Sequence, residues 1–337
     1  MSQSPQTFLS SIKDDVWHDQ TGEGAFECWT FDALSDDGRG AVSVSFYDNY
    51  VLSPRYFADP RVRFPAVTFV YSVDGKNIYH KMVEYAAESF NSDGEVAACS
   101  IGENKFRVDR AQYGSGYMVN LELATRGGRR FEVSMEWLSV EADLLEANDN
   151  TISSWNVVVP RSDVSGRITL IGRCGQAKST FQFRGTGSHE HFRSNSSIID
   201  TFATRQWGRA HFVDTTVFFC RQTLDVGEQI EKLYLVRDGQ LSAYDAIFDK
   251  KKSLRSRYGA KYPQRLTIST DENISLHVKP IHTIESGFCN VKLLSEMTLT
   301  FADSKPRTTT GIAEFCTPKR MQNRLFRFLT GLGISRK

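Results

Sequence analysis

Acid–base side chains gather just past the middle of the chain, where residues 184–191 read Arg-Gly-Thr-Gly-Ser-His-Glu-His. The segment Trp-Gly-Arg-Ala-His at 207–211 follows closely, and together the two hold three of the seven histidines. Successive side chains of a strand point to opposite faces, so His189 and His191 are expected on one face and Glu190 on the other. Imidazoles, a carboxylate and an indole supply the acids, bases and cation-tolerant surface that proton transfer requires.

The His-x-His pair has two other interpretations. It can be a pair of half-buried polar residues at the edge of a sheet. It can also bind a metal, as in cupin-like barrels, where a carboxylate follows a few residues later, but residues 192–199 contain none. Because a third ligand is missing nearby in the sequence, we expect no metal site.

Length and composition limit the class of protein. A chain of 337 residues is long enough for two domains, each with its own core. A net charge of +1 gives no overall field for nucleic acid, which we exclude as a partner. The six cysteines form no Cys-x-x-Cys motif and the first residues resemble no signal peptide, so we expect a cytoplasmic protein with reduced thiols. No apolar stretch is long enough to span a bilayer, which leaves only peripheral membrane contact.

Alternation of apolar and polar side chains predicts a fold that is almost wholly β. In residues 41–47, for example, Val42, Val44 and Phe46 would face a core. Glycine turns such as Asp74-Gly75 separate many similar runs, which favours antiparallel sheets that close or stack. The runs are 41–47, 66–73, 105–108, 116–124, 131–137, 155–160, 164–171, 179–184, 216–221, 232–236, 265–269, 274–278, 290–294, 297–301 and 311–315. A short helix is expected within residues 242–257.

We therefore divide the chain into an N-terminal β domain at 15–195, a C-terminal β domain at 196–316 and a basic tail at 317–337. The tail carries no acidic residue from Lys319 onward, and its apolar residues recur at helical spacing, namely Met321, Leu325, Phe328, Leu329 and Leu332. Such a helix either lies in a membrane surface or packs on the fold and closes it.

Five short motifs, in this order along the chain, resemble those of the carotenoid 1,2-hydratases, also called hydroxyneurosporene synthases. The motifs are Glu27-Cys-Trp-Thr-Phe-Asp32, Trp155 with Pro160-Arg161, Gly185-Thr-Gly-Ser-His-Glu-His191, Trp207-Gly-Arg-Ala210 and Gly311-Ile-Ala-Glu314. The sequence is also similar to the lipocalin-like fungal Diels-Alderases that share this architecture. The resemblance implies a tandem lipocalin-like fold of antiparallel barrels or sandwiches, a pocket between the domains, and cofactor-free chemistry on an apolar isoprenoid or polyene.

This sequence departs from the family motif at three places. Ser188 stands where the family has tyrosine, Glu190 where it has aspartate, and Phe-Arg-Ser at 192–194 where it has Asn-Trp-Gly. His189 is kept and the carboxylate is one methylene longer, so the site of protonation on the substrate is expected to differ.

Hydration or cyclisation of an alkene begins with a proton delivered to carbon, which requires an acid kept protonated by its surroundings. We predict Glu190 as that acid, with His189 and His191 as the other catalytic residues. Trp155, Trp207 and Trp29 are predicted to contact substrate, although core packing is the alternative for such tryptophans. Arg209 either binds a polar end of the substrate or pins the domain junction.

The predicted function is thus a hydratase (a lyase) or a cyclase (an isomerase) in carotenoid- or terpenoid-like biosynthesis. Two alternatives remain: a pericyclase that folds a polyene by positioning alone, and a non-catalytic binder of an apolar ligand.

Overall fold

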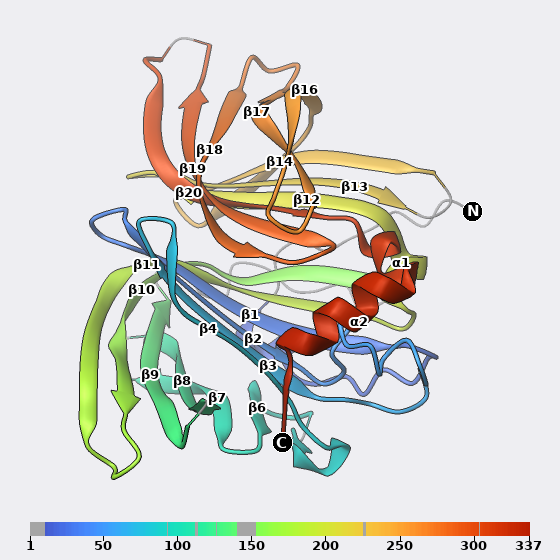
Figure 1. Ribbon diagram of the computed structural model, residues 1–337. Coiled ribbons are helices and arrows are strands. Elements are labelled where there is room, and N and C mark those ends of the chain that lie inside the picture. Colours follow the sequence, from blue (N-terminus) through green and yellow to red (C-terminus); the bar gives the residue numbers. More distant parts are fainter. Residues whose placement is uncertain are drawn as a thin grey trace.

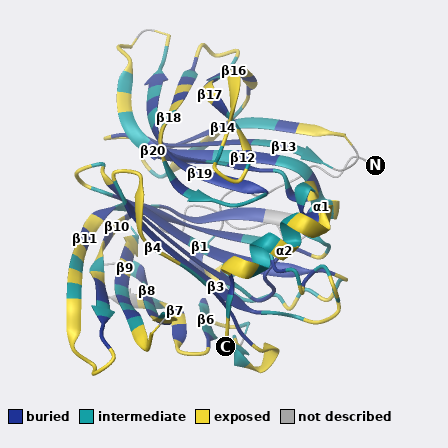
Figure 2. Cartoon of the chain, in the orientation of Figure 1, coloured by how far each residue is buried: buried dark blue, intermediate teal, exposed yellow. Residues whose placement is uncertain are grey.

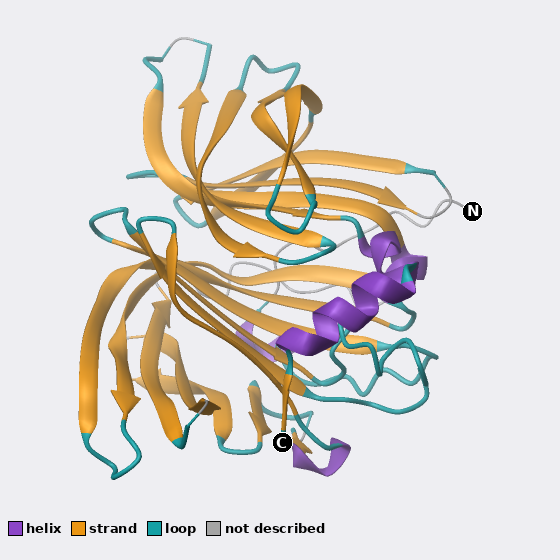
Figure 3. Ribbon diagram, in the orientation of Figure 1, coloured by secondary structure: helices purple, strands orange, loops and turns teal. Residues whose placement is uncertain are grey.

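The computed structural model describes residues 11–92, 94–111, 114–125, 127–139, 153–224, 227–302 and 304–337. Most of these residues form two curled sheets that stack on each other, one above the other in Figure 1. Figure 3 shows that strands dominate and that a single longer helix lies near the C-terminus. The predicted all-β class, with tandem lipocalin-like barrels and a short C-terminal helix, is confirmed.

The first sheet has the strand order β21-β4-β3-β2-β1-β11-β10-β9-β8-β7-β6-β5. Its strands are β1 (Phe26–Ser35), β2 (Gly40–Tyr47), β3 (Ala66–Val73), β4 (Lys76–Glu84), β5 (Phe90–Asn91), β6 (Ala98–Ile101), β7 (Asn104–Ala111), β8 (Gly114–Thr125), β9 (Arg129–Ser139), β10 (Ser153–Ile171), β11 (Ala177–Ser194) and β21 (Ser335–Arg336). All neighbours pair antiparallel except β21, which joins β4 in parallel.

The second sheet has the order β15-β14-β13-β12-β20-β19-β18-β17-β16. Its strands are β12 (Phe202–His211), β13 (Thr216–Leu224), β14 (Gln229–Arg237), β15 (Gln240–Asp245), β16 (Ile247–Arg255), β17 (Lys261–Ser269), β18 (Ser275–Ser286), β19 (Asn290–Thr300) and β20 (Arg307–Cys316). Asp238-Gly239 forms the expected turn between β14 and β15, with positive φ at both residues.

Three local predictions are wrong. The runs expected at 290–294 and 297–301 form one uninterrupted strand, β19. The helix expected within residues 242–257 is absent, because those residues lie in β15 and β16, and β16 pairs with β17 along its length. The runs expected at 155–160 and 164–171 are one strand, β10, in which irregular pairing between Val157 and Ser162 accommodates Pro160. Proline has no N–H for the ladder, so a bulge is where a sheet tolerates it.

Both faces of the central strand β1 are buried. Trp29, Phe31 and Ala33 point into the core enclosed by the first sheet. Leu34 points the other way, into a cluster that includes Ile312 of the second sheet. Figure 2 shows the same pattern, with buried residues concentrated where the two sheets face each other. Because alternate side chains of β1 face different surroundings, polar residues of that strand can line the junction between the sheets.

The helical segments are short. They are η1 (Ile12–Asp14), η2 (Ala87–Ser89), α1 (Ile198–Thr201), η3 (Pro318–Gln322) and α2 (Arg324–Gly333). Figure 1 shows α2 lying across the side of the molecule where the two sheets meet, and the chain then runs to β21 at the edge of the first sheet. Among the described residues, none of the helices has the length and apolar character that crossing a membrane requires.

Candidate functional site

Strand β11 sends its acid–base residues to two different places. In the pairing of β1 with β11, Trp29 lies opposite His191 and Thr30 lies opposite Glu190. Directly opposed residues of paired strands share a face. The histidines therefore enter the core of the first sheet, whereas Glu190 faces the second sheet, as alternation predicts. Strands β1 and β11 approach each other so closely that glycine is required at 185, since a Cβ on Gly185 would lie 1.9 Å from the carbonyl oxygen of Leu34.

Glu190 is held by residues from two other strands. The indole Nε1 of Trp155 on β10 donates to one carboxylate oxygen at 2.9 Å, and Nη1 of Arg209 on β12 donates to the other at 2.8 Å. The structure thus brings together three of the predicted site residues, although they come from both sheets. Arg209 also donates to Asp32 on β1, so it joins the sheets through two carboxylates, as the pinning interpretation expects.

A buried lysine extends this network. Nζ of Lys292 on β19 lies 3.1 Å from Oδ2 of Asp32, donates to Ser43 at 2.9 Å and lies 3.5 Å from Oε2 of Glu314. Burial alone would raise the pKa of Asp32, but Lys292 and Arg209 outweigh it and lower that pKa to about 2. Asp32 is therefore ionised at any physiological pH.

Glu314 differs from the other carboxylates of the network. Burial raises its pKa from 4.5 to about 7, because the attraction of Lys292 only partly offsets the loss of hydration and the repulsion of Glu285 and Asp32. Near neutral pH Glu314 therefore holds a proton far more readily than an exposed glutamate does. A carboxyl group poised near neutrality in a polar cluster is the pattern expected of a general acid.

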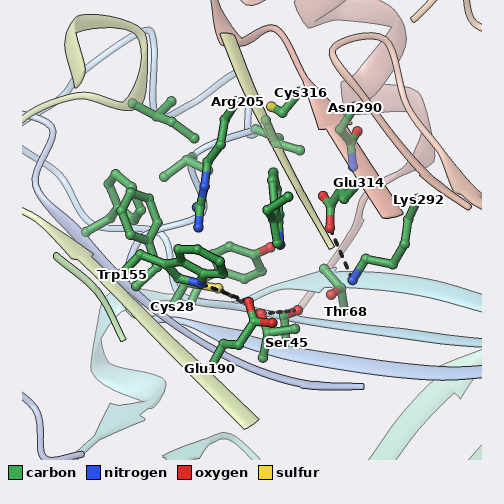
Figure 4. A pocket seen from close by; sticks show the side chains of 18 of the residues that line it. Cys28, Ser45, Thr68, Trp155, Glu190, Arg205, Asn290, Lys292, Glu314 and Cys316 are labelled. Atoms are coloured by element: carbon green, nitrogen blue, oxygen red, sulfur yellow. Dashed lines mark hydrogen bonds and ion pairs between the residues drawn. The ribbon is translucent and has the colours of Figure 1, made fainter. Parts of the chain in front are cut away.

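Four charged residues of this network line a cavity of about 100 Å³ between the sheets, namely Asp32, Glu190, Lys292 and Glu314 (Figure 4). Aromatic side chains form much of its wall, namely Phe26, Tyr47, Tyr50, Trp155, Phe192, Phe202 and Trp207. Figure 4 shows Glu190 beneath Trp155, and Glu314 and Lys292 on the opposite side. Such a cavity offers an apolar surface, aromatic faces that stabilise a cation, and a carboxylic acid.

A second cavity of about 340 Å³ lies beneath α2 and shares Tyr50, Leu52, Glu285 and Asn290 with the first. Small-molecule sites usually enclose about 300–1,000 Å³. The first cavity alone is below that range, so a long substrate would extend through the shared residues into the second.

His189 and His191 belong to a separate polar cluster in the core of the first sheet. Nε2 of His189 lies 2.8 Å from Asp15, and its ring stacks on Phe31 with centroids 3.9 Å apart. His191 lies between Asp15 and Glu27, with its nitrogens 3.1 and 3.0 Å from carboxylate oxygens. Burial would lower the pKa of His191, but hydrogen bonds to Asp15 and Glu27 raise it to about 9.

His18 completes this cluster. Its Nδ1 lies 3.3 Å from Glu27, and the ligand atoms of His18, Glu27 and His191 all fall within 4.8 Å of one another. The three residues could hold a metal ion if His191 gave up its proton, because only a deprotonated imidazole nitrogen binds metal. In the structure His191 lies between two carboxylates, an arrangement that favours its protonated form.

No protein-family model matches the chain. A relative named hydroxyneurosporene dehydrogenase, from Chlorobaculum tepidum, is 21% identical and covers 95% of this chain and 90% of its own length. The predicted resemblance to the hydroxyneurosporene family is confirmed. Among solved structures, the protein NE1406 of Nitrosomonas europaea, described as ATTH, matches with a TM-score of 0.64 at 16% identity over 92% of this chain and 97% of its own. CghA, solved with Sch210972, matches with a TM-score of 0.58 at 14% identity over 92% of this chain and 96% of its own. The structural matches show the fold.

The predicted residues divide between two places. Glu190, Trp155 and Trp207 line the cavity between the sheets, and Arg209 binds Glu190 from behind. The other three do not reach that cavity. His189 and His191 lie in the core of the first sheet, where Trp29 stacks on His191 with ring centroids 4.7 Å apart. His189 has no hydrogen bond to Glu190 in the described part of the chain, since their side chains leave opposite faces of β11.

Sequence reasoning missed five charged residues of the cavity, of which Glu285 on β18 belongs to no motif. Asp32 and Glu314 end two of the family-like motifs, so the motifs themselves could have indicated them. Lys292 and Arg205 belong to no motif, and only the stacking of the two sheets brings them to the cavity.

Proposed function

We propose that this protein is a cofactor-independent enzyme that protonates an apolar polyene or isoprenoid in the cavity between the sheets. The observation that carries the proposal is Glu314, a carboxylic acid with a pKa of about 7 on an aromatic-lined wall. The name of the Chlorobaculum relative refers to hydroxyneurosporene, which supports a substrate of this class. The product is a hydrated or cyclised compound of carotenoid- or terpenoid-like biosynthesis.

In this mechanism the Glu314 hydroxyl gives its proton to one alkene carbon, and the π electrons form the new C–H bond. The positive charge left on the neighbouring carbon lies against indole faces such as those of Trp155 and Trp207. Water then adds and loses a proton to the Glu314 carboxylate, which yields an alcohol and restores the acid. If a second double bond of the substrate attacks instead, a ring closes and Glu314 takes back a proton from carbon.

Glu190, the acid predicted from the sequence, takes a different role in this proposal. Its two oxygens accept hydrogen bonds from Trp155 and Arg209, an arrangement that suits a carboxylate. We assign it to holding the Trp155 indole in place and to offsetting positive charge on the substrate. His189 and His191 then stabilise the first sheet and do not transfer the proton.

Mass change of the product tests the reaction. Purified protein is incubated with candidate polyenes in heavy-oxygen water: hydration adds one labelled water, ring closure leaves the mass unchanged, and dehydrogenation removes two hydrogens. Glu314→Gln should lower turnover by roughly 10²–10⁴-fold, the usual contribution of a general acid. The matched control is Glu296→Gln, which removes a carboxylate from an exposed pair with Lys279. Ring closure that survives Glu314→Gln unchanged would favour a pericyclase, and no turnover of any polyene would favour a binding protein.

A pericyclase is the second candidate, and the likeness to CghA supports it. A cycloaddition needs a wall that folds the polyene into a reactive shape, without a proton donor. The aromatic lining supplies such a wall, so the effect of Glu314→Gln separates the two reactions.

We also propose that α2 binds a membrane surface. Leu325, Phe328 and Leu332 lie on its outer face and are 59%, 62% and 67% exposed. On its inner face, Phe326 stacks on Phe288 with centroids 5.3 Å apart. The helix therefore packs on the fold and still presents an apolar stripe to solvent, among basic residues that would attract anionic lipid. Leu332 also lines the second cavity, so an apolar substrate could enter from the bilayer there.

Sedimentation with anionic vesicles tests the membrane contact. Replacing Leu325 and Phe328 by serine should abolish binding and leave the melting temperature nearly unchanged, because neither side chain is buried. The control replaces Val213, in the connection between β12 and β13, and Ile247 of β16; these residues are 96% and 66% exposed, and the change should leave binding intact. Wild-type protein that stays in the supernatant at low salt would refute the contact. Deleting the tail is a poorer test, since β21 pairs with β4 and its loss would disturb the sheet.

A further inference from the structure

Arg205 of β12 points into the cavity between the sheets from the wall opposite Glu190 (Figure 4). Only 4% of the residue is exposed. Its guanidinium carbon lies 4.2 Å from the ring centroid of Trp207, 4.5 Å from that of Trp155 and 4.8 Å from that of Phe192. Stacked aromatic rings hold the group in place, because a guanidinium packs well on such faces.

Two nitrogens of this guanidinium, Nε and Nη2, have no hydrogen-bond partner among the described residues. A buried polar group without a partner is costly, and charged groups more so than neutral ones. The neighbouring Arg209 shows the usual solution, since its two terminal nitrogens donate to Glu190 and Asp32. Arg205 therefore keeps two unpaired donors at the cavity wall, with no acceptor of the described residues at hydrogen-bond distance from either.

Nε–H and Nη2–H lie on one edge of a guanidinium and point in parallel, which matches the two oxygens of a carboxylate. The same chain uses this edge twice. Nε and Nη2 of Arg39 donate to the two oxygens of Asp74, and those of Arg61 donate to the two oxygens of Asp59 at 3.0 and 3.3 Å. In both pairs the edge is filled by a carboxylate, whereas in Arg205, a residue of the cavity wall, both nitrogens of this edge are buried without a partner among the described residues.

We propose that Arg205 binds a carboxylate of the substrate, so that the substrate is an acid with a long apolar chain. This inference rests on the proposed function, in that the cavity between the sheets is taken as the substrate site. The carboxylate would lie at the Nε/Nη2 edge of the guanidinium, in the cavity that Glu314 also lines. The apolar chain would then pass Tyr50 and Leu52 into the second cavity beneath α2.

Fluorescence titration with cis-parinaric acid, a conjugated polyene with one carboxylate, tests the proposal. Its methyl ester has the same chain without the charge. Wild-type protein should bind the acid at least tenfold more tightly than the ester, because a charge-assisted bidentate pair is stronger than a neutral contact. Arg205→Gln should remove this preference and change ester binding by less than about twofold. Arg205→Lys should keep part of the preference, since lysine retains the charge and loses the bidentate edge.

Arg61→Gln is the matched control, because it removes the same edge from an exposed pair and should leave both affinities unchanged. Equal binding of acid and ester by the wild-type protein would overturn the proposal, and that comparison stands even if Arg205→Gln fails to fold. A preference for the acid that survives in folded Arg205→Gln would also overturn it. The binding site and the proposed catalysis are tested separately. A protein that binds the acid through Arg205 but never turns over a polyene would support the carboxylate site and refute only the proposed enzyme activity.

Discussion

Replacement of Glu314 by glutamine should stabilise the protein at alkaline pH while it removes the proposed acid. Glutamine has nearly the shape of a protonated glutamate but cannot ionise. In the folded protein the pKa of Glu314 is raised from 4.5 to about 7. The folded state therefore holds this proton more tightly than the unfolded state, and stability is lost as the pH rises from about 4.5 to 7. A pKa difference of this size corresponds to a free-energy cost of about 3 kcal/mol at pH 8.5.

The assay is denaturant unfolding of wild-type protein and Glu314→Gln at pH 4.5 and 8.5. The two should have similar free energies of unfolding at pH 4.5, where wild-type Glu314 is protonated. At pH 8.5 the variant should be more stable by about 3 kcal/mol, because the ionised carboxylate no longer has to be accommodated. Comparison of the two proteins isolates Glu314 from Asp48, whose pKa burial also raises to about 7.

Equal stability of the two proteins at both pH values would refute the reasoning, since it would mean that Glu314 ionises as it does in water. So would a variant that is less stable at pH 8.5, which would show that the ion pair with Lys292 outweighs burial. Glu296→Gln is again the control, because an exposed pair should change the free energy of unfolding by less than about 1 kcal/mol at either pH. Turnover by the wild-type enzyme should fall above about pH 7, as the acid loses its proton.

Three further predictions concern the polar groups of the first sheet and the cavity. Because the folded pKa of His191 is about 9, its contribution to stability is complete below pH 6.5 and is lost as the pH rises through 9. In urea unfolding, His191→Gln should lack this pH dependence and should be less stable than the wild type by roughly 3–5 kcal/mol at pH 6. A pH profile that the substitution leaves unchanged would contradict the assignment. Chelators should leave turnover unchanged, whereas stoichiometric zinc or iron in the purified protein, with turnover lost on chelation, would assign His18, Glu27 and His191 to a metal. Glu190→Gln should retain turnover within about tenfold if its role is positioning, and a loss as large as that of Glu314→Gln would return the acid to Glu190.

Alternation along residues 185–191 was sufficient to place His189 and His191 on one face of a strand and Glu190 on the other, because strand geometry is local. The sequence could not show which face meets which partner. Asp32 and Lys292 are 260 residues apart and meet only because the two sheets stack. The helix expected within residues 242–257 failed for the same reason, since the ladder with β17 outweighs local preference.

The tail illustrates a further limit. Helical spacing correctly predicted α2, yet spacing alone does not distinguish an apolar stripe that packs from one that faces solvent. In the structure the inner face of α2 packs on the fold through Phe326, whereas Leu325, Phe328 and Leu332 stay exposed. Only the way the helix packs on the fold separates those two sets.

The charges of the cavity connect the acid to the inferred substrate. Arg209 and Lys292 together contact three carboxylates, and Glu314 is the most weakly held, at 3.5 Å from Lys292. Arg205 also lowers the pKa of Glu314 by its charge. A substrate carboxylate bound to Arg205 would neutralise that charge and raise the pKa of Glu314 above its value in the free protein. The pH at which kcat falls should therefore lie above the pH at which kcat/KM falls, so that binding of the acidic substrate itself keeps Glu314 protonated for the reaction.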